Sequence, residues 1–127
     1  MSNFVGDERV AQFVERELGV NFIPPFTTMG VEKDGEIIGG VVFNIFENHD
    51  VHATVAGRGF GKAFLADVGQ YVYATLNKER ITVITEQPKV VRLAQKLGGQ
   101  LEGCLRNHFG RGRDAFVAGI LKEEYRF

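Results

Sequence analysis

The sequence has little cysteine, no long apolar run and almost no net charge, and each shortage excludes a class of protein. Its single cysteine, Cys104, excludes an internal disulfide and a cysteine-based zinc cluster. No stretch approaches the roughly 18 apolar residues of a membrane span, and Met1–Gly6 lacks the basic start and apolar stretch of a signal peptide. The net charge of −1, from 15 basic and 16 acidic residues, provides no global field for nucleic acid or anionic lipid. We therefore expect a cytoplasmic protein with no membrane partner, and the balanced charge disfavours a nucleic-acid partner.

What is present is the composition of an ordinary globular domain. The 127 residues are 44% apolar and 24% charged, which excludes disorder as the main state. No internal repeat, low-complexity tract or linker interrupts the chain. We expect one domain over residues 1–127, large enough to bury a real core.

Hydrophobic periodicity in the first half predicts a helix followed by three strands. The helix spans about Asp7 to Leu18, with Asp7 as N-cap and Gly19 as the stop. Asp34-Gly35 suits a tight hairpin turn, because both residues can take a positive φ. The three strands are predicted at Thr27–Lys33, Glu36–Phe46 and about His49–Val55.

The second half continues with helix, strand, helix and two strands. These elements are predicted at Gly61–Asn77, Arg80–Glu86, Pro88–Leu97, Gln100–His108 and Asp114–Leu121. The whole order predicts a mixed α/β domain built on one central sheet.

A glycine-rich turn separates the third strand from the second helix. Gly57, Gly59 and Gly61 alternate there, so the backbone can approach a phosphate at the helix start, where amide N–H groups and the helix dipole favour an anion. An ordinary turn is the alternative. A P-loop is excluded because Ala56 and Ala63 replace its first glycine and its hydroxyl residue, and the spacing also fails the dinucleotide-binding fingerprint.

The segment Arg-Gly-Phe-Gly-Lys-Ala-Phe-Leu at 58–65 resembles the pyrophosphate-binding segment of the GNAT superfamily of acyl-CoA N-acyltransferases. That family's signature, Gln/Arg-x-x-Gly-x-Gly/Ala, places its glycines on Gly59 and Gly61. Downstream, Gln87–Gly99 is similar to the family's Asn-Pro…Leu-Tyr-x-Lys-Leu-Gly-Phe helix, and the last two strands match its closing pair. The resemblance covers about residues 27 to 121.

The resemblance implies a GNAT-like mixed, centrally splayed sheet flanked by helices, with a shortened N-terminal helical part. It also implies an N-acetyltransferase that moves an acetyl group from acetyl-CoA directly to a primary amine, small-molecule or peptide, within a ternary complex and without a metal. The implied donor to the thioester oxygen is a backbone N–H near Val51. The full set of implied coenzyme-binding residues is Val51, Gly57, Arg58, Gly59, Phe60, Gly61, Lys62 and Gln87.

Four positions depart from the family's pattern. Ala56 replaces the signature's Gln or Arg, Gln87 the common asparagine, and Gly99 the customary phenylalanine. Ala94 stands where a tyrosine often protonates the leaving thiolate. A second hypothesis therefore remains: a coenzyme A-binding or interaction module of the same fold with weak or lost catalysis.

Glu47, Asp50 and His52 are the candidates for the base that deprotonates the amine, because all lie on or beside the strand that enters the glycine turn. Each is also compatible with a solvated hairpin residue. The three histidines of the chain show no metal-ligand spacing. Cys104 is expected in the core, and Tyr71 and Tyr73 are expected to pack rather than donate a proton.

A local basic cluster surrounds the last strand turn: Arg106, His108, Arg111 and Arg113. A solvated turn, a small nucleic-acid patch, or a border of the acceptor pocket are three interpretations. Asp114 is expected to neutralise part of it. A homodimer is a further expectation.

Overall fold

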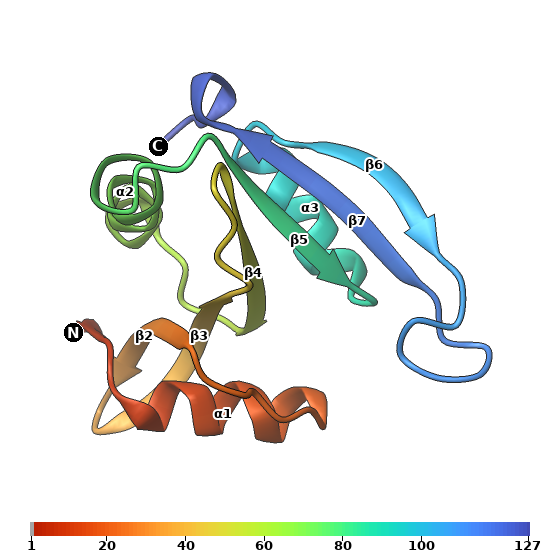
Figure 1. Ribbon diagram of the computed structural model, residues 1–127. Helices are drawn as coiled ribbons and strands as arrows, with labels where there is room; N and C mark the ends of the chain where they lie inside the picture. Colours follow the sequence, from red (N-terminus) through yellow and green to blue (C-terminus); the bar gives the residue numbers. More distant parts are fainter. Residues whose placement is uncertain (1) are drawn as a thin grey trace.

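The computed structural model describes residues 2–127 and is built on a seven-stranded sheet of order β1-β2-β3-β4-β5-β7-β6 (Figure 1). All neighbouring strands are antiparallel except β4 and β5, which are parallel. The strands are β1 (Ser2–Val5), β2 (Phe26–Lys33), β3 (Glu36–Asn44), β4 (Asp50–Gly57), β5 (Arg80–Thr85), β6 (Gln100–Leu105) and β7 (Ala115–Leu121).

Local signals explain where the elements begin and end. The side chain of Asp7 accepts a hydrogen bond from the Arg9 amide at the start of the first helix, and Gly19 ends that helix with a left-handed φ of 66°. At the hairpin, Asp34 (φ 53°) and Gly35 (φ 81°) both have the positive φ that a tight turn requires. The helical elements are α1 (Glu8–Leu18), α2 (Lys62–Gly69), its π-helical continuation η1 (Gln70–Thr75), α3 (Pro88–Lys96) and η2 (Lys122–Glu124). None of the helices within residues 2–127 is long and apolar enough to cross a membrane.

The helices cover the two faces of the sheet. Helix α1 packs on one face through Val14, against Val42 of β3 and Ala56 of β4. Helices α2, η1 and α3 cover the other face and enclose the larger core, which includes the fully buried Phe43 and Phe64. Each such phenylalanine contributes roughly 1.5–3 kcal/mol by burial. Strand β3 is covered on both faces, as its continuous apolar pattern predicts, but it ends at Asn44, two residues before the predicted end at Phe46.

The centre of the sheet is splayed. Parallel pairing joins Asp50–Ala53 of β4 to Arg80–Val83 of β5, and the two strands then part, although both continue (Figure 1). Beyond this point β5 stays paired with β7, and β4 stays paired with β3. The mixed, centrally splayed sheet flanked by helices, which the family resemblance implies, is confirmed.

Three details differ from the sequence-based expectations. Strand β1 was not predicted, because four residues are too short for a periodic pattern. The second helix changes to π-helical hydrogen bonding from Gln70 onward. The placement of Cys104 in the core was wrong: β6 is an edge strand whose six residues are all exposed, Cys104 among them.

Candidate functional site

The glycine turn leads directly from β4 into α2. Gly57 (φ +89°) and Gly59 (φ +94°) have backbone conformations that other residues rarely adopt, and a Cβ at Gly59 would lie 2.9 Å from Cδ1 of Ile38. Gly61 differs, because it has an extended backbone and a Cβ there would meet no protein atom within 4 Å. Gly57 and Gly59 are therefore needed for the backbone conformation of the turn, whereas the exposed side of Gly61 has room for a ligand.

The start of α2 has no side-chain cap and has basic neighbours. Gly61 is the N-cap and offers no side chain to the amides of the first turn. Arg58 and Lys62 are both exposed beside it. The sequence reasoning missed a third cation, Lys89 at the start of α3, whose Nζ donates to the carbonyl of Gly57 at 3.3 Å. Phe60 takes a different role from the others, because its ring packs against Phe64 with centroids 5.5 Å apart.

Because of the splay, the second half of β4, after Ala53, does not pair with β5, and its backbone groups on that edge face the opening. Val51 lies in the paired half, opposite Ile81, and is fully buried, so it does not border the opening. Val55 does: its carbonyl accepts a hydrogen bond from Nε2 of Gln87 at 3.0 Å. Gln87 is held at the start of α3 by its own amide, which donates to Oγ1 of Thr85. Gln87 thus bridges the open edges of the two strands.

A cleft of about 680 Å³ opens on the α1 side of the splay. Its wall combines residues from the end of α1, the loop that follows, the facing halves of β4 and β5, and the turn between β6 and β7. Among the base candidates, His52 lines this cleft, and Glu47 and Asp50 do not. The volume falls in the usual range for small-molecule sites.

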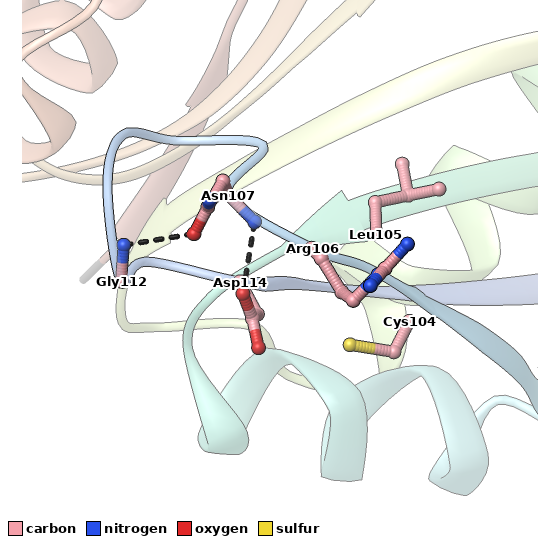
Figure 2. Close-up of a pocket in the computed structure, with 6 residues that line it drawn as sticks. All are labelled: Cys104, Leu105, Arg106, Asn107, Gly112 and Asp114. Atoms are coloured by element: carbon pink, nitrogen blue, oxygen red, sulfur yellow. Dashed lines mark hydrogen bonds between the residues drawn. The ribbon is translucent and has the colours of Figure 1, made fainter.

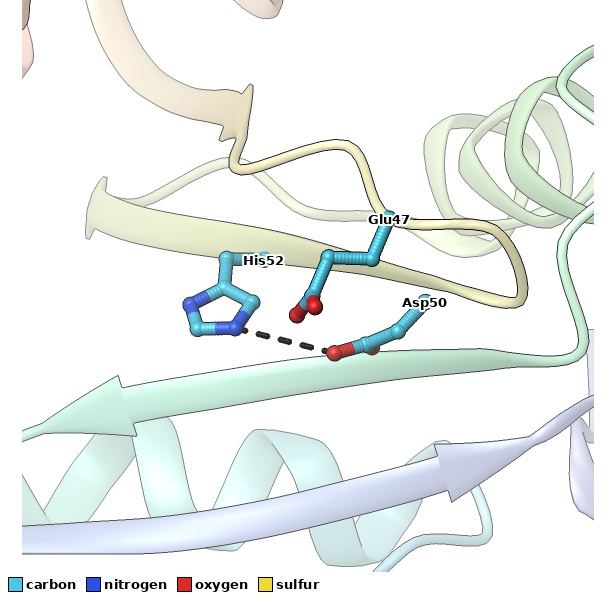
Figure 3. A group of neighbouring side chains, drawn as sticks. All are labelled: Glu47, Asp50 and His52. Atoms are coloured by element: carbon cyan, nitrogen blue, oxygen red, sulfur yellow. Dashed lines mark ion pairs between the residues drawn. The ribbon is translucent and has the colours of Figure 1, made fainter.

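The structure brings the three base candidates together (Figure 3). Their nitrogen and oxygen ligand atoms lie within 4.8 Å of one another, and Nε2 of His52 is 3.6 Å from Oδ2 of Asp50. Asp50 is itself fixed from β5, because it accepts the hydroxyl of Thr82 at 2.8 Å and lies 3.6 Å from Nε of Arg80. The His52 ring therefore faces a carboxylate whose position is set by two residues.

This cluster is also a set of possible metal ligands, which the spacing of the histidines alone did not indicate. Arg80 already provides a positive charge beside Asp50. The guanidinium of Arg80 is charged over a wide pH range, because its hydrogen bond to Glu102 raises the pKa of Arg80. That no metal takes part stays a prediction.

The basic turn is ordered and partly neutralised. The side chain of Asn107 accepts from the amide of Gly112, and Asp114 accepts from the amide of Asn107, both at 2.8 Å (Figure 2). Asp114 was expected to neutralise part of the cluster. Its Oδ1 instead accepts a hydrogen bond from the backbone amide of Asn107, and Glu86 forms the ion pair with Arg113. Hydrogen bonding lowers the pKa of Glu86 and raises the pKa of Arg113, so both are charged at neutral pH. This pair joins the end of β5 to the turn beside the cleft.

The hydroxyl groups of all three tyrosines form hydrogen bonds with residues that do not line the cleft. The hydroxyl of Tyr73 donates to the carbonyl of Ile120 at 2.7 Å, Tyr71 bonds Thr27, and Tyr125 bonds the carbonyl of Leu65. The expectation that Tyr71 and Tyr73 pack is confirmed. Ala94 is 2% exposed and belongs to the larger core. Within residues 2–127, no tyrosine lines the cleft, and position 94 does not reach it.

Comparisons with known proteins find likeness in structure alone. No family model and no curated protein matches the chain. Glutamate-to-glutamine mutant forms of the spermidine/spermine N-acetyltransferase SpeG from Vibrio cholerae match with a TM-score of 0.76 at 19% identity, over 98% of this chain and 97% of that chain. Spermidine N-acetyltransferase from the same organism, in complex with CoA and spermine, matches with a TM-score of 0.72 at 17% identity, over 98% and 97%.

A dodecameric structure of that enzyme in an intermediate state gives a TM-score of 0.71 at 19% identity, over 96% of this chain and 94% of that chain. Identities this low show the shape of the chain and not its activity. The mixed sheet and its central splay are those that the sequence resemblance implied. The chain has the fold of the GNAT-type N-acetyltransferases.

Proposed function

We propose that the protein is an N-acetyltransferase that transfers an acetyl group from acetyl-CoA to a primary amine by direct attack within a ternary complex. The observation that carries the proposal is the opening between β4 and β5, which has the glycine turn at one end and His52 in the cleft beside it. The fold shared with spermidine N-acetyltransferases supports it.

The coenzyme would lie along this opening. The amides of Lys62 and Ala63 in the first turn of α2 would bind its pyrophosphate, assisted by the charges of Arg58, Lys62 and Lys89. The open half of β4 would pair with the pantetheine arm, together with the side-chain amide of Gln87. Gly57, Gly59 and Phe60 would shape the turn rather than touch the phosphates through side chains.

We assign the donor to the thioester oxygen to the amide of Val55 rather than to Val51. Backbone groups of successive residues in a strand point to opposite edges. The Val55 carbonyl bonds Gln87 on the β5 side, so the Val55 amide is directed to the same open edge. Val51 lies where β4 and β5 are still paired. A donor held there stabilises the negative charge that develops on the carbonyl oxygen.

Acetyl-CoA supplies an activated acyl carbon: the neutral amine nitrogen bonds to it and gives up a proton, the carbon–sulfur bond breaks, and the thiolate takes up a proton. An alkylamine with a pKa near 10 is almost wholly protonated at pH 7, so a base must first remove a proton. His52 lines the cleft and would accept this proton at Nδ1, directly or through a water, because its Nε2 faces Asp50. Asp50, whose Oδ2 lies 3.6 Å from Nε2 of His52, would orient the ring, and Glu47 would add negative charge nearby.

The alternative function is a coenzyme A-binding or interaction module with weak or lost catalysis. It is favoured by a specific observation: no tyrosine among residues 2–127 lines the cleft, and Ala94 is buried in the core. No phenol is then placed to protonate the leaving thiolate. We expect this enzyme to be slow for that reason. Self-association also stays a prediction; one of the matching structures is a dodecamer, and the wholly exposed strand β6 is where a second chain could add.

The test is release of the coenzyme thiol from acetyl-CoA in the presence of primary amines. We expect turnover that rises with pH, and a fall in kcat of roughly 10²-fold in His52→Gln, the usual contribution of a general base. His49→Gln is the matched control, because His49 is exposed and does not line the cleft. If the wild type binds acetyl-CoA but releases no thiol with any primary amine, the binding-module alternative replaces the enzyme.

A further inference from the structure

The cleft that contains His52 has a wall that is mostly apolar. Its large apolar side chains come from four separate parts of the chain: the end of α1 with the loop after it, the end of β3, β5, and the turn between β6 and β7. They are Leu18, Val20, Phe22, Ile45, Ile84 and Phe109. A wall assembled from distant segments and left open to solvent is typical of a binding site for an apolar group.

The charges in the cleft do not suit a polycation. Two carboxylates line it, those of Glu17 and Glu86, in the part of the chain that the structure describes. The Glu86 carboxylate is already engaged by Arg113 through two hydrogen bonds. Arg113 and His108 also line the cleft. Since Glu86 and Arg113 neutralise each other, an acceptor with several ammonium groups would meet one remaining carboxylate in the wall, that of Glu17.

Ile45 has an unusual backbone conformation for its residue type. It follows the last residue of β3 with a φ of +50°, although β-branched residues rarely adopt the left-handed region. Its side chain is 54% exposed, so burial in the core does not offset this strain. Asparagine or glycine would fit the backbone better. What an isoleucine adds at this position is apolar surface in the wall of the cleft, next to the strand that carries His52.

We propose that the acceptor is a primary amine with a single ammonium group on an aromatic or branched apolar body, and that Ile45 determines this specificity by contacting that body. The proposal rests on the proposed acetyl transfer and names its substrate class. It differs from the polyamines named for the structurally similar proteins. The amine nitrogen would face His52, and the apolar body would lie along Ile45, Phe22 and Phe109.

The test compares 2-phenylethylamine, propylamine and spermidine as acceptors with the full chain at saturating acetyl-CoA. We expect kcat/KM for 2-phenylethylamine to exceed that for spermidine and for propylamine by at least tenfold. Ile45→Asn should raise KM for 2-phenylethylamine at least fivefold, with kcat and the KM for acetyl-CoA within twofold of wild type. The melting temperature should not fall, because asparagine tolerates a φ of +50°. Ile45→Leu, which keeps the apolar bulk, should retain a KM near the wild-type value.

Ile23→Asn is the matched control, since Ile23 is 82% exposed and does not line the cleft. It should change no kinetic constant. A tenfold preference for spermidine, or an unchanged KM in Ile45→Asn, would overturn the proposal while leaving acetyl transfer intact. If no amine supports turnover, calorimetric titration of 2-phenylethylamine decides separately: binding that Ile45→Asn weakens supports the ligand class although the transferase proposal fails, and absence of binding overturns both.

Discussion

The three glycines of the turn, Gly57, Gly59 and Gly61, have different structural roles although they are the same residue type. Gly57 and Gly59 are required by positive φ and by close neighbours in β3, so substitution there disturbs the turn itself. The sequence alone predicts a steric role toward the ligand for each glycine, and this interpretation would favour Gly59→Val as a test. The structure shows that such a variant would strain the backbone and meet Ile38. A side chain added at Gly61 would extend into the open space beside the turn and would meet no protein atom at its Cβ within 4 Å.

The first prediction concerns Gly61→Val. The valine should weaken acetyl-CoA binding at least tenfold, because its side chain would occupy the space that we assign to the pyrophosphate. The free energy of unfolding should fall by about 1 kcal/mol or less, since valine is a poorer N-cap than glycine. Calorimetric titration and urea unfolding measure the two effects.

Gly103→Val is the matched control for that variant. A Cβ at Gly103 also meets no protein atom within 4 Å, and Gly103 lies on the exposed strand β6, far along the chain from the turn. Its acetyl-CoA affinity should equal that of the wild type. Wild-type affinity in Gly61→Val would contradict the assigned place of the pyrophosphate.

At the scale of elements, the chain after β7 ties together the two helices that border the opening. Tyr125 packs edge-on against Tyr73 and lies against Gly69, and its hydroxyl donates to the carbonyl of Leu65 in α2 at 2.5 Å. The next residue, Arg126, donates its amide to the carbonyl of Leu97 at the end of α3, at 2.9 Å. The position of α2, and with it the turn, thus depends on a few C-terminal residues.

This arrangement predicts a dependence of stability on alkaline pH. Burial raises the pKa of Tyr125 to about 12, and it also raises the pKa of Tyr73. Since the folded state holds these protons more tightly than the unfolded chain, their contribution is complete below the unfolded pKa of about 10 and is lost as pH rises from there toward 12. Tyr125→Phe should lower the free energy of unfolding at pH 7 by about 1 kcal/mol, for the lost hydrogen bond.

Urea unfolding between pH 7 and 11 measures this effect. The stability of Tyr125→Phe should decline less steeply above pH 10 than that of the wild type, and a double variant with Tyr73→Phe less steeply still. An equal decline in all three proteins would show that the buried phenols do not cause it.

At the scale of the whole molecule, caps, turns and periodicity are local signals, and they predict the order of all strands and α-helices except β1. The central splay between β4 and β5 was implied by the family resemblance. The candidate site depends on how segments far apart in the sequence are aligned with one another, and local sequence patterns do not specify that alignment. The bond from Gln87 to Val55, the cleft wall at Ile45 and the ion pair of Arg113 with Glu86 each join segments far apart in the chain. For the same reason the strand of Cys104 was predicted, but not that this strand forms an exposed edge.

The central claim is that the opening between β4 and β5 is the binding site for acetyl-CoA. Acetyl-CoA at a hundredfold excess over its Kd would stabilise the folded state by about 2.7 kcal/mol if it binds that state alone. A stability measurement does not show where the ligand binds. Amide hydrogen exchange with and without saturating acetyl-CoA does. We predict slowed exchange at Val55 and from Gly59 to Ala63, with the edge strand β6 unchanged. Slowed exchange confined to other elements, or no change anywhere, would contradict the account.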